Sequence, residues 1–174
     1  MQKEAGYRNV YESVRELVTG NGASKDTFLK AAAMLQERFG FLWTGFYFAE
    51  DLPGIDALRC SGKDEGDSDL YSKGPWLILG PGVGPPACER IRYGRGVCGT
   101  AWKEDRTVIV PDVDLFPGHI ACSSESRSEI VVPLKSDRVL GVLDIDSREI
   151  GTFDEADAMW LERICGIISR SMVR

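Results

Sequence analysis

Hydrophobic positions near the N-terminus recur at helical spacing in two successive segments. In the first segment they are Val10, Val14, Leu17 and Val18. The run Gly20-Asn21-Gly22 then provides a stop signal. In the second segment Ser24 is placed to cap a helix, Gly40 is placed to end it, and the apolar positions are Phe28, Ala31, Ala32, Leu35 and Phe39. The pattern therefore predicts two N-terminal helices.

A further helix is predicted at the C-terminus. Residues from Thr152 to Glu155 match a capping box, with Thr152 as the cap and Glu155 three positions later. The apolar positions that follow are Met159, Trp160, Ile164, Ile167 and Ile168. Cys165 falls within this helix beside apolar neighbours, so we expect it to be a small core residue.

Between these helices the pattern changes to short apolar runs. Residues 41–49 form an aromatic run typical of a buried strand. Further strands are expected at 76–79, around Ile91, at 107–110, at 129–134 and at 139–146, with a hairpin turn at 135–138. Helices at both ends with consecutive strands between them predict an α+β domain with a mainly antiparallel sheet.

One segment, about 51–75, departs from this periodicity. It gathers Gly, Asp, Ser and Lys residues and is expected to be a surface loop or insertion. Cys60 lies within it and is expected to be an incidental thiol. The 174 residues, 43% of them hydrophobic, match a single domain spanning 1–174.

Charge and hydropathy exclude two broad function classes. The chain has 27 acidic and 21 basic residues, a net charge of −6 and no Lys/Arg cluster, which argues against nucleic-acid binding. The N-terminus lacks an apolar core of the kind found in export signals, and no apolar run approaches the length of a membrane span. We therefore expect a soluble cytoplasmic protein whose five cysteines can start as thiols.

Three of those cysteines are concentrated between Cys88 and Cys122 and are the strongest candidates for chemistry. A cysteine is nucleophilic as the thiolate, and a helix N-terminus or a nearby cation lowers the thiol pKa. Cys98 lies in a glycine-rich run where a short helix can begin, and Cys122 lies in a loop that also carries the only histidine, His119. For any one of these cysteines, a role as a small buried apolar residue is the alternative.

These residue types also occur in two other kinds of site. Zinc sites usually contain a close cysteine pair, whereas the intervals here are ten and twenty-four residues, so no metal is expected. A cysteine hydrolase with Cys122 as nucleophile and His119 as base is a further alternative. A lone histidine in such a loop is more often a structural hydrogen-bonding group.

Acidic residues on adjacent strands form a second candidate group. Glu129 opens one predicted strand, and the period-two alternation puts Asp144 and Asp146 on one face of the next. Carboxylates in apolar strands are costly unless they are paired or used, although a solvated strand face is the alternative. Trp43 and Tyr47 also share a face, where they either line the core or form an aromatic wall over a cationic group.

Three segments together resemble the free methionine-(R)-sulfoxide reductases, which are single-domain enzymes with a GAF fold. These segments are LGPGVGPPACERIRYGRGVCGTAW, DVDLFPGHIACSSESRSEIVVPL and VLGVLDIDS. The resemblance runs from about Trp43 to the C-terminal helix and also fits the two N-terminal helices. Residues 51–75 depart from it, because this chain is longer there than the compact family pattern.

The resemblance implies a role for each candidate residue. Cys122 matches the nucleophile that attacks the sulfoxide sulfur, Cys88 the resolving cysteine, and Cys98 an auxiliary cysteine. The residues that match the substrate pocket are Glu129, Asp144, Asp146, Trp43 and Tyr47. The implied cycle passes through a sulfenic acid on Cys122 and a disulfide with Cys88.

The same resemblance implies the substrate and the partners. The substrate is free L-methionine-(R)-sulfoxide, the electron donor is a thioredoxin-like protein, no cofactor is needed, and the protein forms a homodimer. The alternative from another function class is a GAF module that binds a small molecule or senses redox state without turnover.

Overall fold

The computed structural model describes residues 2–60 and 75–173, and its centre is a six-stranded antiparallel sheet. The strands follow the order β3-β2-β1-β6-β5-β4 across the sheet. Their bounds are β1 Trp43–Ala49, β2 Trp76–Val83, β3 Arg90–Arg92, β4 Val108–Val110, β5 Ser128–Lys135 and β6 Val139–Ser147. Every neighbouring pair is antiparallel, so the predicted α+β class and antiparallel sheet are confirmed.

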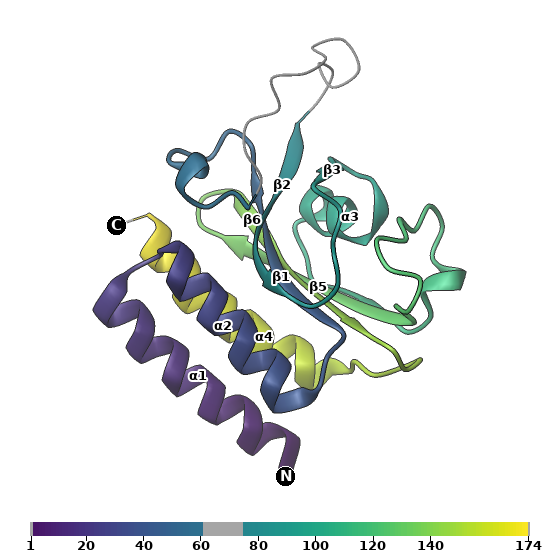
Figure 1. Ribbon diagram of the computed structural model, residues 1–174, viewed down its shortest axis with the longest axis horizontal. Coiled ribbons are helices and arrows are strands. Elements are labelled where there is room, and N and C mark those ends of the chain that lie inside the picture. The colour runs from purple at the N-terminus through teal and green to yellow at the C-terminus, as the bar shows by residue number, and fades with distance from the viewer. Residues whose placement is uncertain (1, 61–74, 174) are drawn as a thin grey trace.

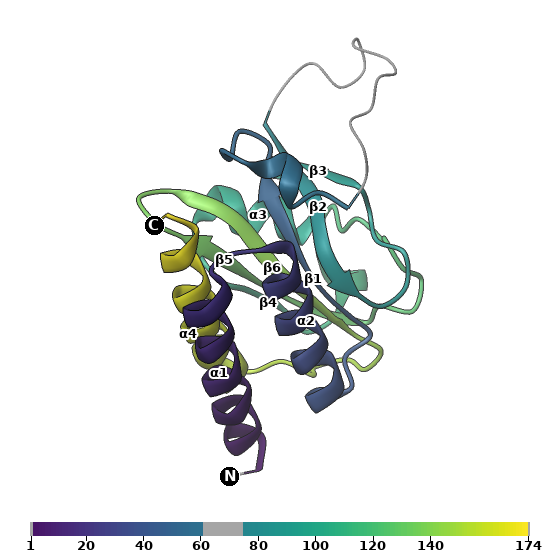
Figure 2. The same cartoon turned by 60° about the vertical axis from the view of Figure 1, so that its left-hand side comes forward.

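Three long helices cover one face of this sheet, and a short helix lies on the other face (Figure 1). The long helices are α1 Gln2–Asn21, α2 Lys25–Phe39 and α4 Glu155–Met172, and the short one is α3 Gly96–Glu104. Two 3-10 turns, η1 Ile55–Ala57 and η2 Val113–Leu115, complete the described elements. Figure 2 shows α1, α2 and α4 side by side on the same face of the sheet.

The ends of α2 lie where the sequence predicts them. The Ser24 side chain accepts a hydrogen bond from the backbone N–H of Thr27, and Gly40 adopts a left-handed conformation with φ of 71°. The Gly40 N–H donates to the carbonyl of Gln36. These contacts satisfy backbone groups that a helix end otherwise leaves without partners.

The start of α4 differs from the prediction by two residues. Asp154, rather than Thr152, is the N-cap, and Asp157 completes the capping box in place of Glu155. Thr152 instead donates its hydroxyl hydrogen to the backbone carbonyl of Glu149. Asp157 is favoured at the third helical position because its carboxylate also accepts a hydrogen bond from the buried Tyr7 of α1, which ties the two helices together.

The strand β1 separates two hydrophobic cores. Its side chains alternate, so that Phe46 and Phe48 pack into the larger core beneath α1, α2 and α4, while Tyr47 packs into the smaller core beneath α3. Cys165 lies in the larger core, as its apolar neighbours in α4 predict. Burial of both faces explains why residues 41–49 have no polar side of their own.

The strand β2 continues past the predicted range of 76–79 into a glycine-rich run. A Cβ atom at Gly80 would lie 2.3 Å from the ring of Phe48, and one at Gly82 would lie 2.4 Å from the ring of Trp43. Glycine at these two positions lets the aromatic rings of β1 lie against the backbone of β2. A strand signal based on β-branched residues therefore misses this part of the sheet.

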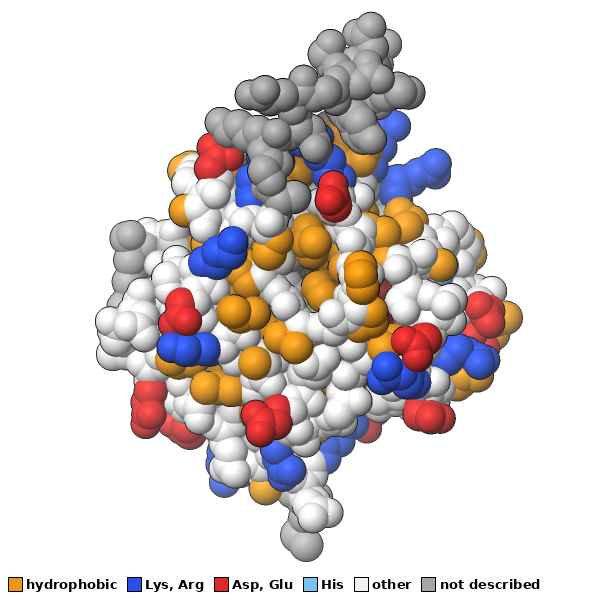
Figure 3. Space-filling view, in the orientation of Figure 1, with side chains coloured by type: hydrophobic (Ala, Val, Ile, Leu, Met, Phe, Trp, Pro, Cys, Tyr) orange, Lys and Arg blue, Asp and Glu red, His pale blue; other side chains and the backbone are white. Residues whose placement is uncertain are grey.

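The structure describes only part of the predicted insertion at 51–75. Residues 61–74 of it lie outside the described residues, and the preceding part contains η1 and the exposed Cys60. Elsewhere on the surface, Figure 3 shows hydrophobic side chains toward the middle of one face, with charges of both signs interspersed around them. Within residues 2–60 and 75–173, no helix is long and apolar enough to cross a membrane.

Candidate active site

A disulfide between Cys88 and Cys122 joins two loops above the face of the sheet that carries α3. The Cα atoms of these residues are 5.4 Å apart, and 34 positions separate them in the sequence. Cys88 lies between β2 and β3, and Cys122 lies between η2 and β5. The bond is the one expected between the two cysteines, and the remaining described thiols, Cys60, Cys98 and Cys165, are free.

Three carboxyl groups lie on the sheet beside this disulfide. Glu129 of β5 pairs directly with Asp146 of β6, and Asp144 lies two residues earlier on β6. Leu143 and Ile145 point to the opposite face and join the larger core. The alternation in the sequence therefore predicts correctly that Asp144 and Asp146 share a face.

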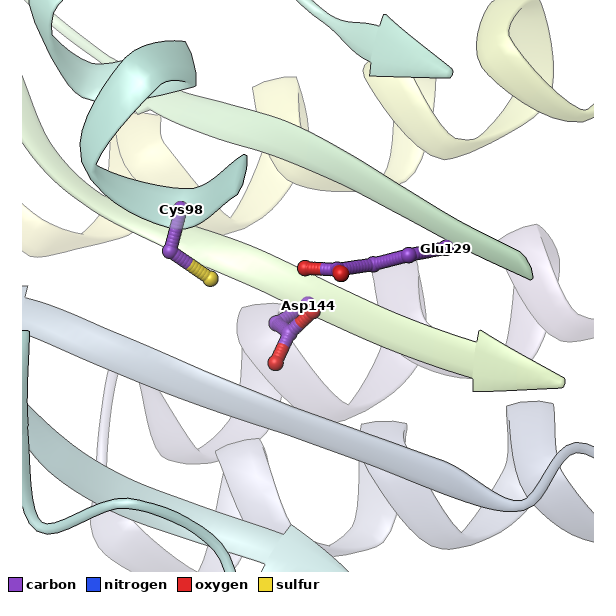
Figure 4. Close-up of side chains that lie close together, drawn as sticks. All are labelled: Cys98, Glu129 and Asp144. Carbon is purple, nitrogen blue, oxygen red and sulfur yellow. The ribbon is translucent and has the colours of Figure 1, made fainter. Parts of the chain in front are cut away.

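Cys98 approaches the same carboxyl groups from α3. Its Sγ atom and one carboxylate oxygen each from Glu129 and Asp144 all lie within 4.8 Å of one another. Figure 4 shows the three side chains converging from α3, β5 and β6. Because two of these elements are strands and one is a helix of the facing layer, only the folded chain brings the three groups together.

Burial raises the pKa of all three carboxyl groups, and the charge of neighbouring carboxylates adds to the rise for Glu129 and Asp144. Burial raises the pKa of Glu129 well above its ordinary value, and the charge of Asp146 adds to the rise. The pKa of Asp144 is raised by the same causes. Burial raises the pKa of Asp146 to about 6, opposed by a hydrogen bond from Ser126 and by the charge of His119.

The pKa of Cys98 moves in the direction opposite to the one expected from its position in a helical first turn. Burial raises the Cys98 pKa well above its ordinary value, and the charges of Asp144 and Glu129 raise it further. The prediction of a site that lowers this pKa is therefore wrong. Desolvation beside carboxyl groups outweighs the effect of the helix N-terminus, which is worth only about 0.3–1 kcal/mol at the surface.

One oxygen of Asp144 is unpaired. Its Oδ2 atom accepts a hydrogen bond of 3.1 Å from the indole Nε1 of Trp43, whereas Oδ1 is buried and has no hydrogen-bond partner among the described residues. A buried acceptor without a partner costs about 1–3 kcal/mol. The arrangement is therefore suited to a ligand that brings a hydrogen-bond donor to Asp144.

The loop with Cys122 is attached to the same acids at two points. His119 Nε2 lies 3.3 Å from an oxygen of Glu129, and the Ser126 hydroxyl donates to Asp146. These contacts stand on either side of Cys122 in the sequence. Ser126 is a site residue that the sequence analysis missed, and its position three residues before Glu129 was the only available signal.

These residues surround one cavity, which together with its mouth comprises about 500 Å³. The predicted site residues in its wall are Trp43, Cys98, Cys122, Glu129, Asp144 and Asp146. Cys88 reaches the site through the disulfide, whereas Tyr47 is fully buried outside the wall and donates its hydroxyl hydrogen to the carbonyl of Cys88.

The converging group of Cys98, Glu129 and Asp144 is also the one among the described residues that could hold a metal ion. All three groups have raised pKa values, so an ion would have to displace protons that burial favours. The donor set thus suits proton-transfer chemistry at least as well as coordination, and we assign no metal to it.

Comparison with known proteins identifies the family. The profile of the GAF domain matches residues 27–172. The chain belongs to the GAF domain family. GAF domain-containing protein A of Dictyostelium discoideum is 42% identical over 95% of this chain and 92% of its own length. The free methionine-R-sulfoxide reductase of Escherichia coli (strain K12) is 36% identical over 94% of this chain and 87% of its own length.

A solved structure extends the comparison to three dimensions. The free methionine-R-sulfoxide reductase from Neisseria meningitidis, in complex with its substrate, has a TM-score of 0.82 and 42% sequence identity. The alignment covers 98% of this chain and 90% of that chain. Within the GAF family, this protein therefore groups with the free methionine-R-sulfoxide reductases, which are oxidoreductases.

Proposed function

We propose that this protein reduces free L-methionine-(R)-sulfoxide to methionine, with Cys122 as the nucleophile and Cys88 as the resolving cysteine. The observation that carries the proposal is the Cys88–Cys122 disulfide at a cavity lined by protonatable carboxyl groups. Reduction of a sulfoxide needs both a thiol to attack sulfur and an acid to protonate oxygen. The family relationship supports the same reaction.

In the proposed first step the Cys122 sulfur attacks the sulfur of the sulfoxide. A carboxyl group of the cavity protonates the sulfoxide oxygen, which moves to Cys122 and leaves methionine and a cysteine sulfenic acid. Glu129 and Asp144 suit the donor role because their raised pKa values keep a proton available near neutral pH.

In the second step the Cys88 thiol attacks the sulfenic sulfur of Cys122. This attack forms the disulfide and releases the oxygen as water. A thioredoxin-like dithiol then reduces the disulfide by thiol–disulfide exchange and becomes oxidised in its place. Cys98 is buried and has a raised pKa, so its proposed role is auxiliary.

The substrate ammonium group completes the electrostatics of the cavity. It supplies a donor for the unpaired Oδ1 of Asp144, and the indole of Trp43 stands beside it. Negative charge on the acids opposes thiolate formation at Cys122, and a bound cation offsets this charge. The pKa of Cys122 should therefore fall when a non-reducible substrate analogue binds, and an unchanged pKa would count against this coupling.

The preference for a free amino acid has the same origin. A methionine sulfoxide residue within a peptide has no ammonium group, so it would leave the buried acids without their partner. Loss of a charged hydrogen bond in a buried site costs several kcal/mol, on the order of a hundredfold or more in discrimination.

The decisive experiment is coupled turnover with a thioredoxin system on each epimer of free methionine sulfoxide. We expect turnover of the R epimer alone, its loss in Cys122→Ser, and unchanged turnover in Cys60→Ser, which removes an exposed thiol. Turnover of the S epimer alone, or turnover that survives Cys122→Ser, would contradict the proposal. Binding of the R epimer without turnover would favour a GAF sensor.

A further inference from the structure

The position of Cys122 depends on contacts that the loop makes with the sheet. Cys122 lies in neither a helix nor a strand, and the disulfide to Cys88 restrains it only in the oxidised protein. When the disulfide is reduced, the other contacts of the loop are what remains to hold it in place. On the N-terminal side of Cys122 the polar contact to the cavity acids is the one between His119 and Glu129.

This contact is well protected from solvent. The side chain of His119 is 13% exposed and that of Glu129 is 8% exposed. A hydrogen bond to a charged or buried group is stronger in such a place than at the surface. The backbone N–H of His119 also donates to the carbonyl of Phe116, which fixes the turn that aims the imidazole at the sheet.

The partner of His119 in this contact, Glu129, also belongs to the proposed catalytic group. Glu129 is one of the acids to which the proposed function assigns substrate binding and proton donation. This one contact thus relates the loop that bears the nucleophile to the acid beneath it. His119 is the only histidine in the chain, and the hydrolase alternative required it as a base for Cys122.

We infer that His119 is a positioning residue, whose Nε2–H donates to Glu129 and thereby holds the reduced Cys122 loop over the cavity. The imidazole acts as a hydrogen-bond donor and not as a base. Two consequences follow for the thiols. The Cys88 and Cys122 sulfurs stay close together after reduction, and Cys122 stays aligned with Glu129. The second consequence rests on the proposed function, whereas the first does not.

The test compares His119 variants that differ in whether a side-chain hydrogen-bond donor can reach Glu129. In His119→Gln the side-chain amide nitrogen can occupy the place of Nε2, in His119→Asn it is too short to reach Glu129, and in His119→Ala there is no donor. Leu115→Ala, at an exposed position of η2, controls for general loop disturbance. Thermal unfolding of each oxidised variant establishes that it is folded before it is compared.

The first measurement is the equilibrium of the Cys88–Cys122 disulfide in a glutathione redox buffer. Without the contact between His119 and Glu129, the reduced loop gains conformational freedom, which formation of the disulfide must then remove. We expect the equilibrium constant for disulfide formation to fall about tenfold in His119→Ala and His119→Asn, and to stay within about twofold of the parent in His119→Gln and Leu115→Ala.

The second measurement is the single-turnover rate of the reduced protein with free methionine-(R)-sulfoxide. We expect the single-turnover rate to fall about tenfold in His119→Ala and His119→Asn and to stay close to the parent rate in His119→Gln. Equal damage by Gln and Ala in both measurements, or wild-type behaviour of His119→Ala, would overturn the inference. If the parent protein itself gives no turnover, the proposed function fails, while the disulfide equilibrium still decides the role of His119.

Discussion

Glu129 and Asp146 lie directly opposite each other on β5 and β6, with both carboxyl groups beside the cavity. Two buried carboxylates this close repel one another, so the pair retains a proton to higher pH than isolated acids would. The same pair receives the two contacts from the Cys122 loop, one from His119 and one from Ser126. Substrate chemistry and loop position thus depend on one pair of acids.

Replacing Glu129 should change the pH dependence of turnover. A proton donor must be protonated, and the pKa of Glu129 is raised, so its contribution is present below that pKa and is lost as pH rises through it. We expect Glu129→Gln to lower the single-turnover rate of the reduced protein about a hundredfold and to remove this decline at high pH. Glu149→Gln, at an exposed position, should keep the parent profile. If the rate of Glu129→Gln still declined at high pH as in the parent, the decline would belong to the titration of another group.

Replacing Asp146 should stabilise the protein in a pH-dependent way. Burial raises the pKa of Asp146 from 3.8 to about 6, so the folded state disfavours its charged form. This penalty is absent below pH 3.8, grows as the pH rises to about 6, and is constant above. Asp146→Asn should therefore raise the free energy of unfolding by up to about 3 kcal/mol at pH 7 and by little at pH 4.

Urea unfolding of the oxidised protein at the two pH values measures this effect. The matched control is Asp137→Asn in the exposed hairpin turn, which should give the same free-energy change at both pH values. A gain from Asp146→Asn that does not depend on pH would show that ionisation is not its cause. Because Asp146 lines the cavity, the stabilised variant should also bind substrate more weakly.

A methyl group at Gly82 should disturb the cavity through Trp43. The added Cβ atom would lie 2.4 Å from the indole ring and 2.9 Å from the Cα atom of Gly45. The ring would have to move, and its hydrogen bond to Asp144 would be weakened. We expect Gly82→Ala to lower the free energy of unfolding by about 1–3 kcal/mol and to raise the KM for the sulfoxide.

Gly20→Ala is the control for this change, since no heavy atom within 4 Å would meet the new methyl group. Alanine in a helix is favoured over glycine by about 0.5–1 kcal/mol, so this variant should be slightly more stable than the parent. If Gly82→Ala and Gly20→Ala changed the free energy of unfolding equally, contact with the Trp43 ring would not be what disfavours a side chain at Gly82.

Thiol labelling should separate the five cysteines by accessibility. In the native oxidised protein, iodoacetamide should modify Cys60 alone, because Cys98 and Cys165 are buried and their pKa values are raised. Denaturation without reduction should give three labels, and denaturation after reduction should give five. Mass spectrometry of the intact protein counts them, and rapid native labelling of Cys98 would contradict its burial.

Much of the fold could be predicted from local patterns. The apolar stripes of α1, α2 and α4 and the short runs of β1, β5 and β6 lie close to where the sequence placed them. The local sequence does not decide the start of α4, because Thr152 and Asp154 both offer capping side chains and the choice depends on the contact of Asp157 with α1. The extent of β2 was missed because its glycines are explained only by the rings across the strand.

The candidate site, like the fold, could be predicted from local sequence patterns only in part. A local period of two residues was enough to put Asp144 and Asp146 on one face, and the crowding of cysteines between Cys88 and Cys122 pointed to thiol chemistry. Local spacing could not show whether Tyr47 would line the cavity, nor that burial would raise the pKa of Cys98. Both depend on which groups exclude water from a side chain.

The sequence by itself determined the faces of the strands, the amphipathic helices and the set of reactive residue types, since each is decided by neighbours a few positions away. Only the tertiary structure decided that Cys98 meets Glu129 and Asp144, and that His119 lies against Glu129. Those contacts join segments from separate layers and loops. Their geometry is set by chain closure and by the burial of charge, which no local pattern encodes.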